Sequence, residues 1–388
     1  MKFSAVLIAV CAAVASAAPL ISTSGTPVPD SYIVVLKGGN TAESFQNKFN
    51  EIARRQNGRG RTPVISRKYK AIDGFAAELN QGALDELLAA PEVDYVEQDQ
   101  IITLQASQPS PPSWGLPRTS QRDRNLSAPY FYQDAAGQGV TAYIIDTGVY
   151  IEHSDFGGRA SYGYNAISGS SNTDENGHGT HVAGTVGGTR FGVAKNVNLV
   201  GVKVLNAQGS GTTAGVVAGM DWVINRARGT KAVANMSLGG GKSATMDAAA
   251  NRFYAANIPL FVAAGNSAGT SACNQSPAGA TQAYTVAASD SSDRFASFSS
   301  WGTCVEIIAP GVGITSAWIG GTSATNTISG TSMATPHVCG AAALLISAEA
   351  GLTTSQAVFD RLTNLATPNK ITGNLRSTPN RLLFNGAV

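Results

Sequence analysis

Residues 140–148 read Val-Thr-Ala-Tyr-Ile-Ile-Asp-Thr-Gly, an apolar run that stops at an acidic residue and a glycine. A strand that is apolar at odd and even positions alike is typical of a parallel sheet covered on both faces. The segments 199–205 and 258–264 have the same character, and 214–228 between them has helical spacing. Strands that alternate with helices predict an α/β domain, a mostly parallel central sheet flanked by helices in three layers.

Three short motifs lie where such a sheet gathers its chemistry, at the ends of strands and the starts of helices. Asp146 directly follows the first strand, His178 lies in Asn-Gly-His-Gly-Thr-His (176–181), and Ser332 lies in Gly-Thr-Ser-Met-Ala (330–334). A serine hydroxyl attacks a carbonyl only when a base takes its proton and a carboxylate orients that base. A serine before a helix is most often a plain N-cap. The conjunction of Asp, His and Ser in this order nevertheless predicts a catalytic triad.

These motifs resemble the subtilisin-like serine proteases, specifically the proteinase K-like branch, from about Trp114 to the C-terminus. The matching stretches are Pro-Ser-Trp-Gly-Leu (112–116), Ala-Ala-Gly-Asn (263–266) and Ser-Gly-Thr-Ser-Met-Ala-Thr-Pro-His (329–337).

The resemblance implies a role for each of four residues. Asp146 would orient the base, His178 would be the general acid and base, and Ser332 would be the nucleophile. Asn266 would donate to the oxyanion, together with the backbone N–H of Ser332. An asparagine next to a glycine also suits a plain turn.

The resemblance also implies a cleft that binds the substrate as an added strand. One edge would be Ser237, Leu238 and Gly239, the other Gly209, Ser210 and Gly211, and the specificity pocket would be walled by Ala263, Ala264 and Gly265. So open and apolar a pocket implies broad cleavage, with a preference for apolar or aromatic residues before the scissile bond. A flexible turn explains the Gly239-Gly240-Gly241 run equally well.

A separate small domain is predicted over residues 29–105. Its expected strands are 32–36, 74–79 and 93–97, and its expected helices are 41–55 and 81–90. This order fits a small α+β, ferredoxin-like fold, and the domain looks like the inhibitory, chaperone-like propeptide of the family. We interpret the basic cluster from Arg54 to Lys70 as a solvated face or a loop.

The two ends of this small domain predict its processing. Lys2, an apolar run from Phe3 to Val14 and Ala15-Ser16-Ala17 indicate a signal peptide over 1–17. The proline- and serine-rich segment 107–113 predicts an extended linker that is open to proteolysis. We therefore expect a propeptide over 18–106, autoprocessing after Ala106, and a peptidase domain over 107–388.

Because we expect the protein to be exported, its cysteines can form stable disulfides. Cys11 leaves with the signal peptide, so an odd set of three remains, which indicates one disulfide and one free thiol. Cys339 lies in an apolar helical stretch, whereas Cys273 and Cys304 lie in polar, loop-like surroundings. We expect Cys273 and Cys304 to pair, and the resemblance supports this pairing.

Metal and glycan sites are less well indicated. The resemblance points to a calcium site formed by a carboxylate at Glu306 and carbonyls near Thr281 and Ala283, but that carboxylate is normally Asp. The longer side chain favours loss or weaker binding of the ion, so we expect a solvated glutamate and assign no metal ligand. The chemistry itself requires no cofactor.

Three sequons are present, at Asn125, Asn235 and Asn274. Asn125 lies in a polar loop and is the best glycosylation candidate.

Length and composition limit the partners. The 388 residues suffice for one large domain and one small one, and a net charge of +2 does not favour nucleic acid. No later apolar run is long enough to span a membrane. We expect a secreted monomer that acts on proteins and peptides and is inhibited by its own propeptide.

One alternative belongs to another class: a catalytically inactive relative that acts as a binding or inhibitor protein. Such a protein should have lost a triad residue, the oxyanion donor or the small cleft residues, all of which are present. The domain at 29–105 could additionally act alone as a protease inhibitor.

Overall fold

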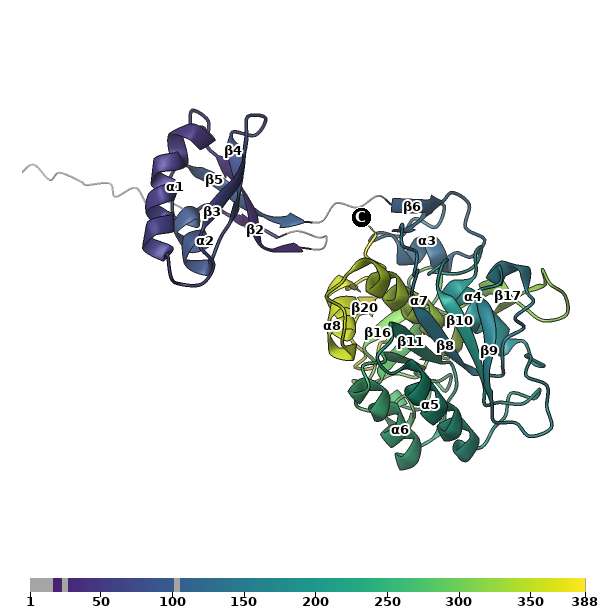
Figure 1. The fold of residues 1–388 in the computed structure, drawn as a ribbon. Helices are drawn as coiled ribbons and strands as arrows, with labels where there is room; N and C mark the ends of the chain where they lie inside the picture. The colour runs from purple at the N-terminus through teal and green to yellow at the C-terminus, as the bar shows by residue number, and fades with distance from the viewer. Residues whose placement is uncertain (1–16, 23–26, 101–104, 388) are drawn as a thin grey trace, which may run out of the picture. The chain divides into compact units, whose positions relative to one another are not determined.

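The computed structural model describes residues 17–22, 27–100 and 105–387, and the chain divides into two compact units, 1–102 and 103–388 (Figure 1). Nearly all of the predicted signal peptide, with Cys11, lies outside the described residues. Each unit has its own hydrophobic core.

The first unit is a five-stranded sheet with two helices. The strand order is β1-β5-β2-β4-β3, and neighbours are antiparallel except β1 and β5. The elements are β1 (Leu20–Ile21), β2 (Pro27–Leu36), α1 (Ala42–Gln56), β3 (Val64–Tyr69), β4 (Gly74–Glu78), α2 (Gln81–Leu88) and β5 (Val93–Gln100). Phe45, Phe49 and Ile52 of α1 and Leu84 and Leu87 of α2 share one core with the sheet. The predicted α+β domain is confirmed.

The basic side chains between Arg54 and Lys70 are all exposed, which confirms the interpretation as a solvated face. Residues 54–70 are not simply a loop, because α1 continues to Gln56 and Val64–Tyr69 forms the edge strand β3. Most side chains of β3 are exposed, so the strand shows no apolar alternation that would reveal it.

The second unit is built on a nine-stranded sheet in the order β19-β20-β16-β15-β13-β11-β8-β10-β9. All neighbouring strands are parallel except β19 and β20. The strands are β8 (Thr141–Asp146), β9 (Ala160–Asn165), β10 (Asn198–Lys203), β11 (Ala232–Met236), β13 (Leu260–Ala263), β15 (Tyr284–Ser289), β16 (Ile307–Pro310), β19 (Thr367–Pro368) and β20 (Arg381–Leu382). The helices are α3 (Gly115–Thr119), α4 (His178–Gly187), α5 (Thr213–Ala227), α6 (Ala244–Ala255), α7 (Thr331–Ala348) and α8 (Ser355–Leu365).

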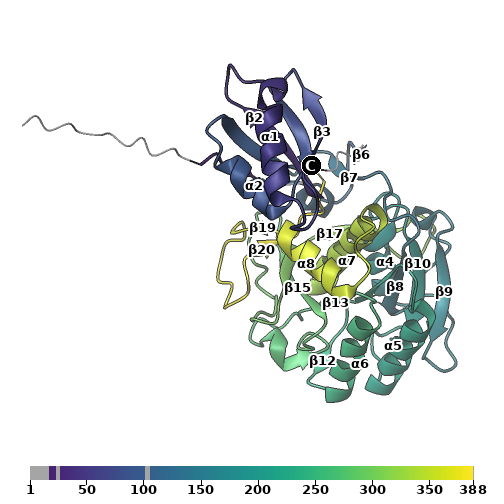
Figure 2. The same ribbon diagram turned by 60° about the vertical axis from the view of Figure 1, so that its left-hand side comes forward.

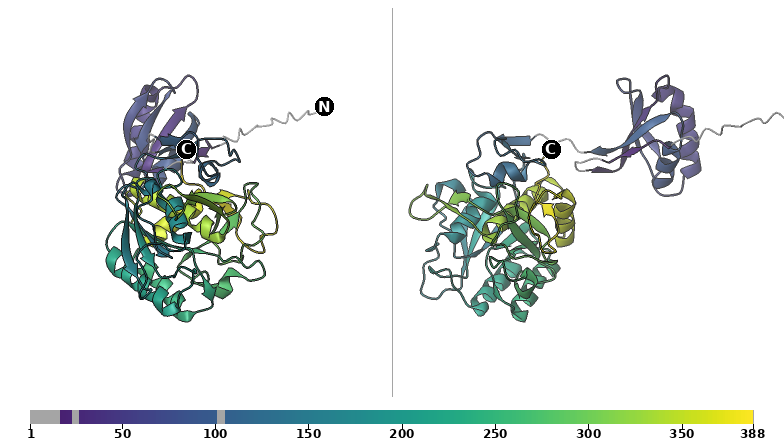
Figure 3. Two further views of the ribbon diagram at one scale, coloured as in Figure 1. Left: turned by 90° about the vertical axis from the view of Figure 1, so that its right-hand side faces the viewer. Right: turned by 180° about the vertical axis from the view of Figure 1, so that it is seen from behind.

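Alternate residues of β8 belong to different cores. Ala142 and Ile144 pack with α4 and α7, whereas Tyr143 and Ile145 pack with α5 and α6. Figures 2 and 3 show these helix pairs on opposite faces of the sheet. The predicted three-layer α/β fold is therefore confirmed.

Short elements complete the second unit. They are β6 (Gln105–Gln108), β7 (Tyr130–Gln133), β12 (Gly240–Gly241), β14 (Gln275–Ser276), β17 (Ile314–Ala317), β18 (Thr325–Ile328) and the 3-10 turns η1 (Ser154–Phe156) and η2 (Ala272–Asn274). The start of the expected linker is not open chain, because β6 pairs antiparallel with β7 and places Ala106 opposite Tyr132. The Gln108 side chain adds bonds to Lys195 Nζ (2.9 Å) and to the carbonyl of Arg190 (3.1 Å).

Two further features concern cysteines and membranes. A disulfide joins Cys273 to Cys304, and Cys339 is a buried free cysteine in α7. Within the described ranges, no helix combines the length and apolar character needed to cross a bilayer.

Candidate active site

The three predicted triad residues lie at element ends of the second unit. Asp146 is the last residue of β8, His178 is the first of α4 and Ser332 is the second of α7. His178 Nδ1–H donates to Asp146 Oδ1 at 2.7 Å, and Asp146 is fully buried. Asp146 Oδ1 also accepts the backbone N–H of Thr147 at 2.8 Å, which fixes the carboxylate toward the histidine.

The Ser332 hydroxyl adjoins the same site. Ser332 Oγ donates to the carbonyl of Ser237 at 3.1 Å, and Ser237 and His178 both line one cleft. Among the described residues, no hydrogen bond joins Ser332 to His178. Catalytic hydrogen bonds are often long or absent without substrate, so this geometry leaves the pair free to form one when substrate binds.

Opposing effects act on the proton affinity of His178. Burial favours the neutral ring, whereas the charge and hydrogen bond of Asp146 and the charge of Asp174 favour the protonated ring. The acidic groups prevail, so the pKa of His178 is raised above its ordinary value. A base with this environment is well suited to accept a proton from a hydroxyl.

Two N–H donors converge beside Gly330. Asn266 Oδ1 accepts both the N–H (2.8 Å) and the hydroxyl (3.0 Å) of Thr331, which aims the amide nitrogen the other way. A Cβ added to Gly330 would lie 3.4 Å from Asn266 Nδ2 and 3.5 Å from the backbone nitrogen of Ser332. The open space beside this glycine is therefore flanked by donors that could hold an oxyanion.

A cleft of about 460 Å³ borders His178. It contains all six residues expected at its edges: Gly209, Ser210, Gly211, Ser237, Leu238 and Gly239. Gly211 must lack a side chain, since a Cβ would lie 2.2 Å from the carbonyl of Val204. Sequence reasoning missed other lining residues, among them Leu205, Val216 and Met246, because apolar residues of helices and strands carry no signal that separates a cleft wall from core.

The expected wall of the specificity pocket does not line this cleft. Ala263 ends β13, Ala264 is fully buried, and Gly265 is half-buried with its N–H on Thr331 Oγ1 at 3.1 Å. Gly265 has a φ of +105°, a conformation that favours glycine.

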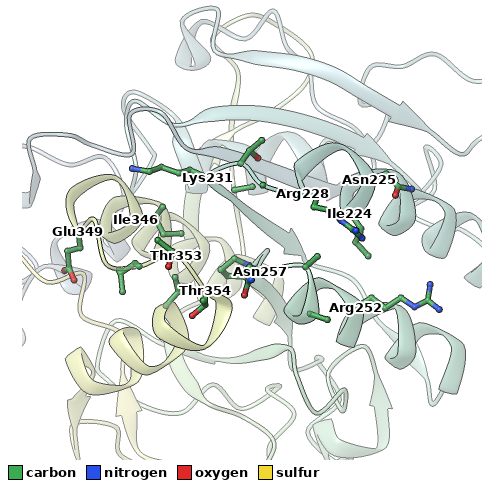
Figure 4. Close-up of a pocket in the computed structure, with 18 of the residues that line it drawn as sticks. Ile224, Asn225, Arg228, Lys231, Arg252, Asn257, Ile346, Glu349, Thr353 and Thr354 are labelled. Carbon is green, nitrogen blue, oxygen red and sulfur yellow. The ribbon is translucent and has the colours of Figure 1, made fainter.

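A larger cavity, of about 800 Å³, lies at the opposite end of the sheet, at the starts of β11 and β13 (Figure 4). Its labelled cations, Arg228, Lys231 and Arg252, come from separate elements and do not converge on one point. Arg228 is the C-cap residue of α5 and Arg252 lies in the last turn of α6, positions where a cation is favourable to the helix dipole. The residues that line this cavity include no serine, cysteine or histidine.

Glu306 is not the solvated glutamate that the sequence led us to expect. It is half-buried, its carboxyl accepts the N–H of Thr285 at 2.5 Å, and burial raises its pKa to about 8. No group of three or more His, Cys, Asp or Glu within the described ranges could hold a metal ion.

Comparisons with protein families agree with this geometry. Residues 137–380 match the model described as "Subtilase family", and residues 31–105 match "Peptidase inhibitor I9".

Named relatives cover most of the chain. It is 44% identical over 378 residues to a cuticle-degrading serine protease of Arthrobotrys oligospora, covering 92% of this chain and 91% of that protein. It is 50% identical over 323 residues to the subtilisin-like serine protease AsES of Sarocladium strictum, covering 81% of each. The crystal structure of a cold adapted subtilisin-like serine proteinase matches with a TM-score of 0.66 and 48% identity, covering 70% of this chain and 97% of that one.

Proposed function

Because this chain belongs to the subtilase family of serine proteases, we propose that it is a secreted endopeptidase with Asp146, His178 and Ser332 as its catalytic triad. The observation that carries the proposal is the 2.7 Å bond between His178 and Asp146, beside the cleft that Ser237 also lines. The family needs no cofactor for its chemistry.

In the proposed reaction, the Ser332 hydroxyl turns from the Ser237 carbonyl to His178 and attacks the scissile carbonyl carbon. His178 Nε2 takes the hydroxyl proton, and Asp146 stabilises the resulting imidazolium. The tetrahedral oxyanion accepts hydrogen bonds from the Ser332 backbone N–H and Asn266 Nδ2. His178 then protonates the departing amine, and water releases the acyl group by the same steps. Because the histidine must start neutral, its raised pKa makes activity fall on acidification from neutral pH.

Substrate would lie as a strand between the two edges of the cleft. Gly211 and Gly239 allow close approach of its backbone, so recognition depends little on sequence. Ala263, Ala264 and Gly265 do not line the cleft, but Leu205, Val216 and Met246 give it apolar walls. This supports broad cleavage, with a preference for apolar or aromatic residues before the scissile bond.

Residues 1–17 would direct export, and residues 18–106 would be the inhibitory propeptide, whose I9 domain covers 31–105. We propose that the enzyme releases it by cutting after Ala106. The exported enzyme would act as a monomer, with Asn125, an exposed residue, as its glycosylation site.

The pairing of β6 with β7 constrains that cut. Gln108 is bonded to the carbonyl of Arg190, which lies beyond the C-terminus of α4, whereas His178 begins the same helix. Ser107 itself lies beside Thr189 and Asn196, also beyond that C-terminus. A ten-residue helix is about 15 Å long, so the bond after Ala106 is held away from the triad while β6 stays paired. The strand must therefore separate from β7 before self-cleavage.

An inactive relative that serves as a binding or inhibitor protein receives no support. It should lack part of the machinery, yet Asp146, His178, Ser332 and Asn266 are all present with the contacts described above.

The proposal is tested by Ser332→Ala, assayed as secreted protein on an apolar peptide anilide. In subtilisin, loss of the nucleophile lowers the rate by about 10⁶-fold, and we expect a comparable collapse here, together with a precursor that stays uncut near Ala106. A Ser332→Ala protein that keeps most of the activity would make Ser332 a helix cap only.

A further inference from the structure

A second buried carboxylate lies next to the proposed triad. Asp174, in the loop before α4, is only 4% exposed. Its two oxygens accept five hydrogen bonds, from Thr147 Oγ1 (2.8 Å), Asn176 N (3.0 Å), Gly177 N (2.9 Å), Thr180 N (2.9 Å) and Thr180 Oγ1 (2.6 Å). Every partner is a donor, so both carboxylate oxygens act only as acceptors.

Acceptors from outside the helix take the place of the side-chain N-cap that α4 lacks. The N-cap residue, Gly177, has no side chain to accept the first N–H groups of the helix. Each of these groups instead has an acceptor from outside the helix: His178 N on Asn176 Oδ1 (3.2 Å), Gly179 N on Thr147 Oγ1 (2.9 Å) and Thr180 N on Asp174 Oδ2. The turn that carries His178 is thus fixed by Asp174, directly and through Thr147.

Thr147 also connects the two carboxylates. Its backbone N–H donates to Asp146 Oδ1 and its hydroxyl donates to Asp174 Oδ1. Asp146, Asp174 and the histidine therefore form one network around a single threonine. Residue 179 must be a glycine for α4 to pack this closely, because a Cβ there would lie 2.1 Å from the carbonyl of Gly148.

We propose that Asp174 is a positioning residue for catalysis, which holds His178 against Asp146 and stabilises the imidazolium that forms in the reaction. This inference rests on the proposed function of the triad. It gives a charge role to a residue that would otherwise only cap a helix.

The charged groups around His178 determine how loss of the Asp174 charge should change the pKa of His178. The titratable groups that interact with it are Asp146 from β8, Asp174 from the loop and His181 from the next turn of α4. The nearby Lys203 of β10 is instead bonded to the Thr147 carbonyl (2.7 Å) and lies 3.5 Å from Glu175. Burial lowers the pKa of His181 to about 4, so that ring is neutral in the working range. Neutralising Asp174 removes one of two anions that favour protonated His178, so the pKa of His178 should fall.

The chain offers a matched control at the other end of the same helix. Asp155 is also 4% exposed and also accepts backbone N–H groups, those of Arg190 (2.7 Å) and Phe191 (3.5 Å). It lies beside the C-terminus of α4, about 15 Å from His178 along the helix. If Asp174 merely tied down the helix, Asp174→Asn and Asp155→Asn should affect activity alike.

The test compares kcat/KM against pH, from pH 5 to 9, for wild type, Asp174→Asn and Asp155→Asn. For Asp174→Asn we expect a lower plateau and an acid limb moved to lower pH, so that activity at pH 6, relative to its own plateau, rises by about twofold or more. Asp155→Asn should keep the wild-type acid limb, whatever it loses in thermal stability. An Asp174→Asn enzyme with the wild-type limb overturns the proposal.

If Asp174→Asn yields no mature enzyme, Thr147→Val tests the positioning role. That variant removes the hydroxyl link but keeps the charge, so the plateau should fall while the acid limb stays in place. A wild-type plateau would contradict the proposal. Ser332→Ala, assayed in parallel, separates the two hypotheses: residual activity there refutes the triad, whereas an inactive Ser332→Ala with an unshifted Asp174→Asn refutes only the role of Asp174.

Discussion

At the scale of single residues, the site depends on donors whose direction is fixed by their neighbours. Asn266 shows this most clearly. Its Oδ1 is held by Thr331, so the amide N–H groups remain for a ligand. An exposed asparagine without such a partner could rotate, and its donors would not be aimed in advance.

Replacing Asn266 by Ala should therefore lower kcat by about 10²–10³ while KM changes little, which is the loss known for the oxyanion-hole asparagine of subtilisin. The loss falls on kcat because the N–H donor binds the oxyanion of the transition state more strongly than the carbonyl of the substrate. Steady-state kinetics on the peptide anilide measure it, with Asn125→Ala as an exposed control. A change confined to KM would place Asn266 in substrate binding instead.

At the scale of elements, a buried ion pair ties α3 to the loop after β15. Arg118 is fully buried and meets Asp293 through two bonds, of 2.8 and 3.0 Å, while a third bond reaches the carbonyl of Gln121. Removing one partner of such a pair leaves the other charge buried without compensation, which is strongly destabilising.

We expect Asp293→Asn to lower the free energy of unfolding by about 3–5 kcal/mol. Denaturant unfolding of the Ser332→Ala protein, which cannot digest itself, measures the change. The control is Asp123→Asn, because Asp123 pairs with Lys370 at a similar distance (2.7 Å) but is highly exposed. Equal losses in the two variants would show that burial does not determine the value of this pair.

Elements were predictable where they are buried and obscure where they are not. The apolar runs at 140–145 and 199–205 correspond to β8 and β10, and the helical spacing at 214–228 corresponds to α5. The edge strands β3 and β9 were missed, since partly exposed strands carry polar residues on both sides.

At the site, the order of residue types indicated the triad and Asn266. Asp174 gave no such signal, because a buried carboxylate and a solvated one read alike in a sequence.

At the scale of the whole molecule, several buried groups link folding to pH. Burial lowers the pKa of His181 and of His337 to about 4, so both rings are neutral in the folded chain. In the unfolded chain they protonate near pH 6.5, so folding loses stability as pH falls from about 6.5 to 4. Glu306, with its pKa raised to about 8, acts in the opposite sense, since the folded state holds its proton more tightly.

The two histidines, His181 and His337, outweigh Glu306 in this pH range. The free energy of unfolding of the Ser332→Ala protein should therefore fall between pH 6.5 and 4.5. Urea unfolding at several pH values measures it. Glu306→Gln removes the opposing group, so its stability should fall more steeply over the same interval. A stability that is flat or rises on acidification would contradict this balance.

The pairing of β6 with β7 has one more consequence, for the reverse of maturation. A serine protease can also re-form a peptide bond when a free amine lies close enough to attack its acyl-enzyme. If the chain is cut after Ala106, as proposed, the new α-amine belongs to Ser107, which the strand pairs opposite Phe131, beyond the far end of α4 from His178. The amine is thereby withdrawn from the reaction as soon as the strand re-forms, and the cut becomes a one-way step.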